Sequence, residues 1–268
     1  MPHSKPILPH DNLPHGTGSP AATKVLGIVG GGRAAWAFGS AWRTIGWPLS
    51  GIVTREPSPI SPLLATERVS LEKLAATSEL ILIAVSDRAI AEVAASIPAT
   101  NAILFHPSGS LTAVRGGFSL HPLRALPPVG EPSGLAGTLL VFEGAHREVA
   151  ETIASAAGGR FAEIRPEQKA LYHAAAVFGS NYVAALLEIA ERLIGLPGCR
   201  DDLAALAVSA VENWRAHPDS RRFTGPAARK DADVLATHLS ALSNEPELSE
   251  LYGLLADEIK RSLLASGE

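Results

Sequence analysis

Residues 167–182, EQKALYHAAAVFGSNY, place polar side chains within an apolar helical pattern. At about 100° per residue, His173 lies about 40° and Ser180 about 20° from Lys169, so the three share one helix face. Asn181 lies farther round, at about 120°. Burial lowers the pKa of a lysine and lets it donate a proton, while an imidazole or amide can hold a developing oxyanion. This face is therefore either a proton-donating site or a water-facing stripe near the helix start.

A second candidate segment is HPSGS, residues 106–110, which follows an apolar strand-like run. In a parallel sheet this position lies at the carboxyl edge, where ligands bind. The hydroxyl of Ser108 and the backbone amide of Gly109 suit a carboxylate or carbonyl oxygen, and His106 can orient a polar group. A structural, hydrogen-bonded role for His106 is an equally open interpretation.

A third candidate is FTGPAARKDADVLATHL, residues 223–239. Thr224 is a good N-cap and the following proline is tolerated in a first turn, so we expect a helix over 223–242. Its N-terminus, together with Arg229, could bind a substrate carboxylate. The alternative is an ordinary capped helix without a ligand.

A glycine turn near the start of the chain predicts a nucleotide site. Gly30, Gly32 and Ala35 have G-x-G-x-x-A spacing between a strand-like run and a helical one. The first glycine permits the tight turn, the second admits a pyrophosphate, and the third position needs a small residue for packing. The helix N-terminus then offers amides to the phosphates, and Arg33 adds a positive charge.

The end of the second strand indicates which nucleotide binds. That strand ends VTRE, which places Thr54 and Arg55 where a positive side chain favours the 2′-phosphate of NADP. Glu56 follows at once, so NAD stays open. The third strand ends AVSD, where Ser86 and Asp87 could border the nicotinamide ribose. The alternative for Asp87 is an N-cap of the next helix.

These residues need a scaffold, and the apolar pattern supplies one. Strand-like runs at 24–29, 49–55, 79–87, 101–109 and 138–144 alternate with helical stretches, which predicts a parallel sheet covered on both faces. After Pro166 the pattern becomes helical, over 167–195, 201–216, 223–242 and 245–265. We predict an α/β fold: a flexible leader over 1–22, a Rossmann doubly wound sheet over 23–165, and an all-α domain over 166–268.

The bulk composition excludes several classes of protein. A net charge of −4 argues against binding of nucleic acid or an anionic membrane surface. Cys199 is the single cysteine, which rules out internal disulfides and fits a reducing cytoplasm. The irregularly spaced histidines of the leader do not predict a metal site. No apolar run is expected to reach the length of a membrane span.

Taken together, GIVGGGRAA, FHPSGSL, LHPLRALP, KALYHAAAVFGSNY and FTGPAARKDADVLATHL resemble a family of bacterial Rossmann-type proteins with a helical C-terminal domain of unknown function. The resemblance covers roughly residues 23–265. That family is similar in architecture to pyrroline-5-carboxylate reductase, ketopantoate reductase, the 6-phosphogluconate and β-hydroxyacid dehydrogenases and the deazaflavin-dependent NADP reductases.

The resemblance implies an NADP-dependent oxidoreductase that acts on a small oxo acid or a related carbonyl or imine. Lys169 matches the catalytic lysine of the β-hydroxyacid dehydrogenases, and HPSGS resembles their substrate loop. His173 stands where those enzymes carry asparagine, which is a departure. The resemblance also implies a homodimer formed through the helical domain. Two alternatives stay open: a non-catalytic NADP-binding regulatory or scaffold protein, and a deazaflavin-dependent NADP reductase.

Overall fold

The computed structural model describes residues 23–265, so the predicted leader lies outside the described residues. The chain divides into two compact units, Met1–Ser180 and Asn181–Glu268. The sequence places the boundary at 165/166, but the structure places it after Ser180. The segment after Pro166 stays with the first unit because its side chains bond to the sheet, as Lys169 does with Ser119.

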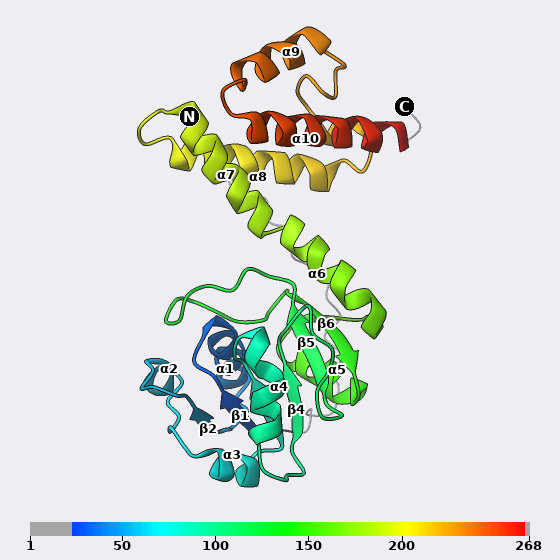
Figure 1. The fold of residues 1–268 in the computed structure, drawn as a ribbon. Helices are drawn as coiled ribbons and strands as arrows, with labels where there is room; N and C mark the ends of the chain where they lie inside the picture. Colours follow the sequence, from blue (N-terminus) through cyan, green and yellow to red (C-terminus); the bar gives the residue numbers. More distant parts are fainter. Residues whose placement is uncertain (1–22, 266–268) are drawn as a thin grey trace, which may run out of the picture. The chain divides into compact units, whose positions relative to one another are not determined.

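The first unit is built on a seven-stranded sheet of order β2-β1-β3-β4-β5-β6-β7 (Figure 1). The strands are β1 (Leu26–Val29), β2 (Leu49–Val53), β3 (Leu80–Ile83), β4 (Ile103–His106), β5 (Phe118–Pro122), β6 (Leu139–Gly144) and β7 (Arg160–Glu163). All neighbouring pairs are parallel except β5 and β6, which are antiparallel. The predicted Rossmann-type sheet is therefore confirmed, with one antiparallel pair added.

Helices cover both faces of the sheet because its central strands are apolar on both sides. Leu80 and Leu82 of β3 pack with α1 (Arg33–Thr44), α2 (Ile60–Leu63) and α5 (Arg147–Ala156). Ile81 and Ile83 of the same strand pack on the opposite face with α3 (Leu71–Thr77) and α4 (Asp87–Ser96). Successive side chains of a strand point to opposite faces, so β3 contributes to both cores.

The strand β5 is absent from the sequence prediction, and its alternation positions the site. Phe118 and Leu120 enter the core on the α1 and α5 face. Ser119 and His121 therefore point to the other face, since the side-chain period of a strand is two. On that face the first-unit chain continues as η1 (Pro166–Gln168) and α6 (Lys169–Phe178), whose side chains meet β5.

The second unit is helical, as predicted. It contains α7 (Asn181–Ile194), α8 (Arg200–Ala216), η2 (Ser220–Arg222), α9 (Ala232–Ala241) and α10 (Pro246–Ala265). The guanidinium of Arg200 joins α8 to α7 through Glu188 and Glu191, at 2.7 and 2.6 Å. The hydroxyl of Tyr252 lies 2.7 Å from Nδ1 of His238, which joins α10 to α9.

Two predicted helices differ from the observed ones. The expected helix over 167–195 is interrupted: α6 ends at Phe178 and α7 begins at Asn181. The expected helix over 223–242 begins only at Ala232, where the carboxylate of Asp231 accepts the amide of Val234 as an N-cap. Thr224 therefore does not cap a helix, because Gly225, with a φ of 91°, turns the chain first.

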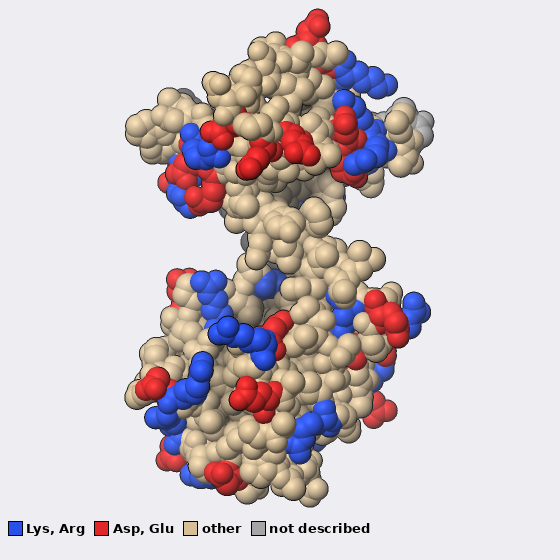
Figure 2. Space-filling model, in the orientation of Figure 1, with Lys and Arg blue, Asp and Glu red and all other residues tan. Residues whose placement is uncertain are grey.

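One stretch of the described chain, Pro166–Ile194, has the length and apolar composition of a membrane-crossing helix, and the mean hydropathy of its most apolar 18-residue window is 1.3. None of its most apolar window is buried. The expectation that no run reaches this length is therefore wrong, because the charged residues of the stretch lie near its two ends: Glu167, Lys169, Glu188, Glu191 and Arg192. On the visible face of each unit, acidic and basic side chains are interspersed (Figure 2).

Candidate active site

The glycine turn between β1 and α1 is shaped for close approach of a ligand. Gly30 has a φ of 121°, and a Cβ there would overlap the carbonyl oxygen of Ala84, so the turn requires glycine. A Cβ on Gly32 would meet no atom within 4 Å. Gly32 is the N-cap of α1 and makes no side-chain capping bond. The first amides of α1 thus border open space, as a pyrophosphate site requires.

The other predicted nucleotide residues surround this turn. Ala35 is fully buried, as expected for the packing position of the motif. The end of β2 lies against the turn, because Thr54 Cγ2 would be 3.2 Å from a Cβ on Gly31. Thr54 Oγ1 is buried and has no hydrogen-bond partner among the described residues. Arg33 and Arg55 are exposed, so their guanidinium groups are accessible to a phosphate.

Asp87 has a different role from the predicted N-cap. Ser86 is the N-cap of α4, and Asp87 is the first residue of the helix. The Oδ2 atom of Asp87 accepts hydrogen bonds from Oγ of Ser108 and Oγ of Ser110, each at 2.8 Å. Asp87 therefore ties the carboxyl end of β3 to the HPSGS segment that follows β4.

Two residues of HPSGS hold the loop instead of facing open space. His106 is fully buried; its Nδ1 accepts the amide of Ser108 at 3.3 Å, and its Nε2 donates to the carbonyl of Thr112 at 3.0 Å. The hydroxyl of Ser108 accepts the amides of Ser110 and Leu111. Burial lowers the pKa of His106. These hydrogen bonds fit a structural role for His106 and for the Ser108 side chain. The substrate contacts expected of both residues stay predictions.

Lys169 is the buried residue of α6, with 2% of its surface exposed. Its Nζ atom donates to Oγ of Ser119 at 2.6 Å and to the carbonyl of Ser108 at 3.3 Å. Glu143 Oε2 lies 3.9 Å from the same Nζ. Burial lowers the pKa of Lys169 to about 8, although the carboxylates of Glu143 and Asp87 oppose the shift. Of the two sequence interpretations, the water-facing stripe is wrong for Lys169.

Glu143, near the end of β6, anchors this cluster through its carboxylate. Its carboxylate accepts the amide of Ala113 at 2.9 Å and the hydroxyl of Ser119 at 3.3 Å. The side chain is almost entirely buried. A buried carboxylate needs such donors and a counter-charge, and Lys169 supplies the charge.

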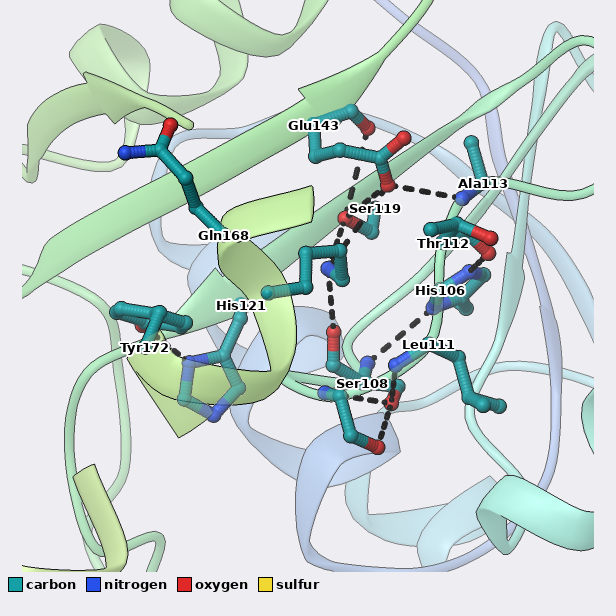
Figure 3. Close-up of polar contacts among 12 residues, drawn as sticks. His106, Ser108, Leu111, Thr112, Ala113, Ser119, His121, Glu143, Gln168 and Tyr172 are labelled. Carbon is teal, nitrogen blue, oxygen red and sulfur yellow. Dashed lines mark hydrogen bonds and ion pairs between the residues drawn. The ribbon is translucent and has the colours of Figure 1, made fainter. Parts of the chain in front are cut away.

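A second cluster lies one turn along α6. The hydroxyl of Tyr172 lies 2.6 Å from Nδ1 of His121 (Figure 3), and the ring of His173 meets His121 edge to face. Burial, followed by the charge of His173, lowers the pKa of His121 to about 4, while burial raises the pKa of Tyr172 to about 12. Gly109 makes room for this cluster, since a Cβ there would lie 2.6 Å from His173 Cδ2.

The structure brings together some of the predicted catalytic and substrate residues. Lys169 and His173 share the side of α6 that faces β5, and Gly109 lies beside them. Ser180 lies beyond the end of α6, and its hydroxyl donates to the carbonyl of Ala176. The place of Ser180 on the common face stays a prediction. Asn181, Thr224 and Arg229 belong to the second unit, and their roles stay predictions.

Three functional candidates are absent from the sequence prediction: Ser119, Glu143 and Tyr172. The available signal was the alternation in FSLHP, residues 118–122, where polar side chains alternate with apolar ones as in a strand. Once β5 is recognised, Ser119 and His121 fall on one face of the sheet. Tyr172 then follows Lys169 by three residues on a helix, the spacing of neighbours on a helix surface.

Comparisons with known proteins agree with this fold. Residues 139–259 match the model of a domain of unknown function, DUF2520. A Bacteroides fragilis protein described as a candidate NADP oxidoreductase superposes with a TM-score of 0.74 at 21% identity, over 90% of this chain and 99% of the other. A Thermotoga maritima protein gives 0.72 at 22% identity, over 91% and 100%. No curated protein sequence matches the chain.

A more distant structural neighbour is an enzyme. The reductive aminase of Aspergillus terreus, in complex with NADPH4, cyclohexanone and allyl amine, superposes with a TM-score of 0.61 at 17% identity, over 91% of this chain and 95% of the other. Its complex with NADPH and ethyl-5-oxohexanoate gives 0.59 at 16% identity, over the same shares. At such identities the likeness establishes the fold alone. The resemblance to Rossmann-type proteins with a helical C-terminal domain is thereby confirmed.

Proposed function

We propose that the chain is an NADP-dependent oxidoreductase that reduces a small oxo acid or a related carbonyl or imine, with Lys169 as the proton donor. The observation that carries the proposal is a buried lysine whose pKa is lowered to about 8, at the sheet edge that also carries the glycine turn. The structural likeness to an NADPH-bound reductive aminase supports the choice of reaction class.

Residues of this chain fit the nucleotide. Gly32 leaves the N-terminus of α1 open to a pyrophosphate, and Arg33 and Arg55 are free to meet a 2′-phosphate. When bound, NADPH supplies a hydride to an electrophilic carbon. Reduction of C=O or C=N also requires one proton, for the oxygen or nitrogen of the product.

Lys169 is suited to provide that proton. A pKa near 8 leaves Nζ mostly protonated at neutral pH and makes it a stronger acid than an ordinary lysine. Ser119 and the carbonyl of Ser108 fix the direction of Nζ, and Glu143 favours its charged form. The neutral imidazole of His121, held by Tyr172, is a further donor for the substrate oxygen.

The test is NADPH oxidation with 2-oxo acids, 3-oxo acids, cyclic imines and ketone–amine mixtures. We expect turnover with one of these classes, and Lys169→Ala to lower it by about 10²–10⁴-fold while NADPH binding is retained. Unchanged turnover in Lys169→Ala would refute the role of Lys169. NADPH binding without turnover of any class would favour the non-catalytic alternative, and a spectral change of added deazaflavin would favour the deazaflavin-dependent one.

We also propose a homodimer formed through the second unit. Large apolar side chains are exposed on α8, among them Leu206, Val211 and Trp214. Exposed apolar patches of this kind mark interfaces in soluble proteins, although Pro166–Ile194 also has the composition of a membrane helix. We expect a dimer by light scattering in detergent-free buffer and a monomer for Val211→Glu, with Leu63→Glu in α2 as the control. Flotation with liposomes would instead support membrane attachment.

A further inference from the structure

The segment between α2 and α3 runs along the outer edge of β2. The amide of Ile52 donates to the carbonyl of Glu67 at 2.9 Å, and the amide of Val69 donates to the carbonyl of Ile52 at 3.0 Å. Arg68 pairs with Ile52 as a parallel bridge. Ser70 then caps α3 by accepting the amide of Lys73, so the segment is fixed at both ends.

This placement brings Arg68 to the turn that follows β2. Its Nη2 donates to the carbonyls of Thr54 and Arg55 at 2.7 and 2.8 Å, and its Nε donates to the carbonyl of Thr54 at 3.2 Å. One guanidinium thus holds both residues that the sequence assigns to nucleotide choice. Because the planar guanidinium donates to two carbonyls at once, it fixes the direction of the turn.

The Thr54–Arg55 turn itself lies against the glycine turn. The amide of Gly30 donates to the carbonyl of Val53 at 2.9 Å, and a Cβ on Gly31 would lie 2.9 Å from Ser58 Oγ. Thr54 Oγ1 is buried and has no partner among the described residues. A buried polar atom without a hydrogen-bond partner is available to a ligand that carries a donor or acceptor.

The charge of Arg68 is not neutralised locally. Within residues 23–265, no carboxylate forms an ion pair with Arg68, while the neighbouring Glu67 pairs with Lys73 at 3.4 Å. Nη1 of Arg68 makes no hydrogen bond in the described part of the chain, so both of its protons are available. Arginine binds phosphate through such paired N–H groups.

We infer that Arg68 determines the preference for NADP over NAD, by holding the Thr54–Arg55 turn and by presenting Nη1 to the 2′-phosphate. The inference rests on the proposed function, since it concerns the nucleotide of that reaction. It assigns specificity to a residue outside both the glycine motif and the second strand. The chemical class that Arg68 recognises is a phosphate monoester on the adenosine ribose.

The experiment is a direct binding titration with NADPH and NADH, followed by nicotinamide fluorescence, so no substrate is needed. We expect Arg68→Ala to raise the Kd for NADPH by about 10- to 100-fold, the effect of losing a charge-assisted hydrogen bond. The Kd for NADH should rise much less. Arg68→Lys keeps the charge but loses the fork, and should restore part of the preference.

Arg115→Ala is the matched control. Nη1 of Arg115 also bridges two backbone carbonyls, those of Ala94 and Ile97 at the end of α4, at 2.7 and 2.8 Å. Arg115→Ala should leave the ratio of the Kd values for NADPH and NADH unchanged. Adenosine 5′-phosphates with and without a 2′-phosphate, used as competitors, should show the same contrast as the full nucleotides.

The outcomes separate the inference from the proposed function. Equal weakening of NADPH and NADH in Arg68→Ala would show a purely structural role and overturn the inference, as would no change in either Kd. Equal affinity of the wild-type protein for both nucleotides would overturn the inference but leave hydride transfer in place with NAD. Binding of neither nucleotide by the wild-type protein would overturn the proposed function itself.

Discussion

Nζ of Lys169 lies 2.6 Å from Oγ of Ser119, and this hydrogen bond joins α6 to β5. A lysine at the start of an exposed helix would ordinarily extend into water. Here it points inward because β5 presents a small polar side chain and β6 presents the carboxylate of Glu143. The geometry therefore makes a charged group part of the interior.

The buried charge of Lys169 should make stability depend on pH. The folded pKa is about 8 and the ordinary value is 10.5, so between these values the unfolded chain binds more protons. Stability therefore rises with pH across this window, and the penalty for burying the charge is present in full below about pH 8. Lys169→Met should remove this rise in the free energy of unfolding, which amounts to at most about 3 kcal/mol.

Urea unfolding from neutral pH to about pH 10 measures this difference. Other groups that titrate in the window are common to both proteins, so the slope of the difference isolates Lys169. Lys260→Met is the control, because Lys260 is exposed on α10 and pairs with Asp257 at the surface. Parallel stability curves for wild type and Lys169→Met would contradict the burial of this charge.

The two outer glycines of the turn after β1 should respond differently to alanine. Gly30→Ala forces a side chain against the carbonyl of Ala84 at a φ of 121°, so we expect a loss of several kcal/mol of stability. Gly32→Ala meets no protein atom and should leave stability nearly unchanged. It should nevertheless weaken NADPH binding by about tenfold or more, because the pyrophosphate must approach this position.

Thermal unfolding and nucleotide titration of the two variants separate structure from binding. Gly253→Ala in α10 is the control, because its backbone is not strained and an added Cβ would meet no atom within 4 Å. Gly46→Ala is less suitable because the φ of Gly46 is positive. Normal NADPH affinity in Gly32→Ala would show that the open space is not the pyrophosphate site.

Local pattern was enough to predict the scaffold of the first unit. Continuous apolar runs such as LILI, residues 80–83, are typical of strands buried on both faces, and the glycine spacing located the first turn. The strand β5 was missed because His121 and Pro122 end a run of only five residues. Its pairing with β4 and β6 is a tertiary effect that local pattern does not encode.

The candidate site was predicted only in part, because local pattern does not encode contacts between distant strands and helices. Lys169 and His173 were found because they share one helix, where spacing alone fixes their relation. Their partners Ser119, His121 and Glu143 come from strands about 25 to 50 residues earlier, and only the sheet register brings them together. Asp87 was expected to cap its helix because short-range rules favour capping; its bonds to Ser108 and Ser110 depend on a neighbouring strand.

Gly109 should be intolerant of a side chain even though its backbone is unstrained. An added Cβ would lie 2.6 Å from His173 Cδ2 and 3.0 Å from His121 Nε2, so both imidazoles would have to move. We expect Gly109→Ala to cost about 1–3 kcal/mol of stability and to lower turnover. Gly134→Ala is the matched control, with no atom within 4 Å. Equal unfolding curves for the two variants would contradict the packing of the histidine cluster.

The pKa values of His106 and His121 should respond to different neighbours. The pKa of His121 is lowered to about 4 by burial, by the charge of His173 and by that of Lys169. The pKa of His106 is lowered by burial and by Lys169, and His173 is not among its causes. His173→Ala should therefore raise the pKa of His121 and leave that of His106 unchanged. Lys169→Met should raise both.

Nuclear magnetic resonance titration of the imidazole signals measures these shifts directly. Because both folded pKa values are depressed, each histidine destabilises the fold when it is protonated, so stability is lost as the pH falls below the ordinary histidine value of about 6.5. A shift of His106 in His173→Ala would show that the two clusters are coupled more widely than the contacts indicate. An unchanged His121 in the same variant would place His173 away from the β5 face of α6, and would remove it from the candidate site.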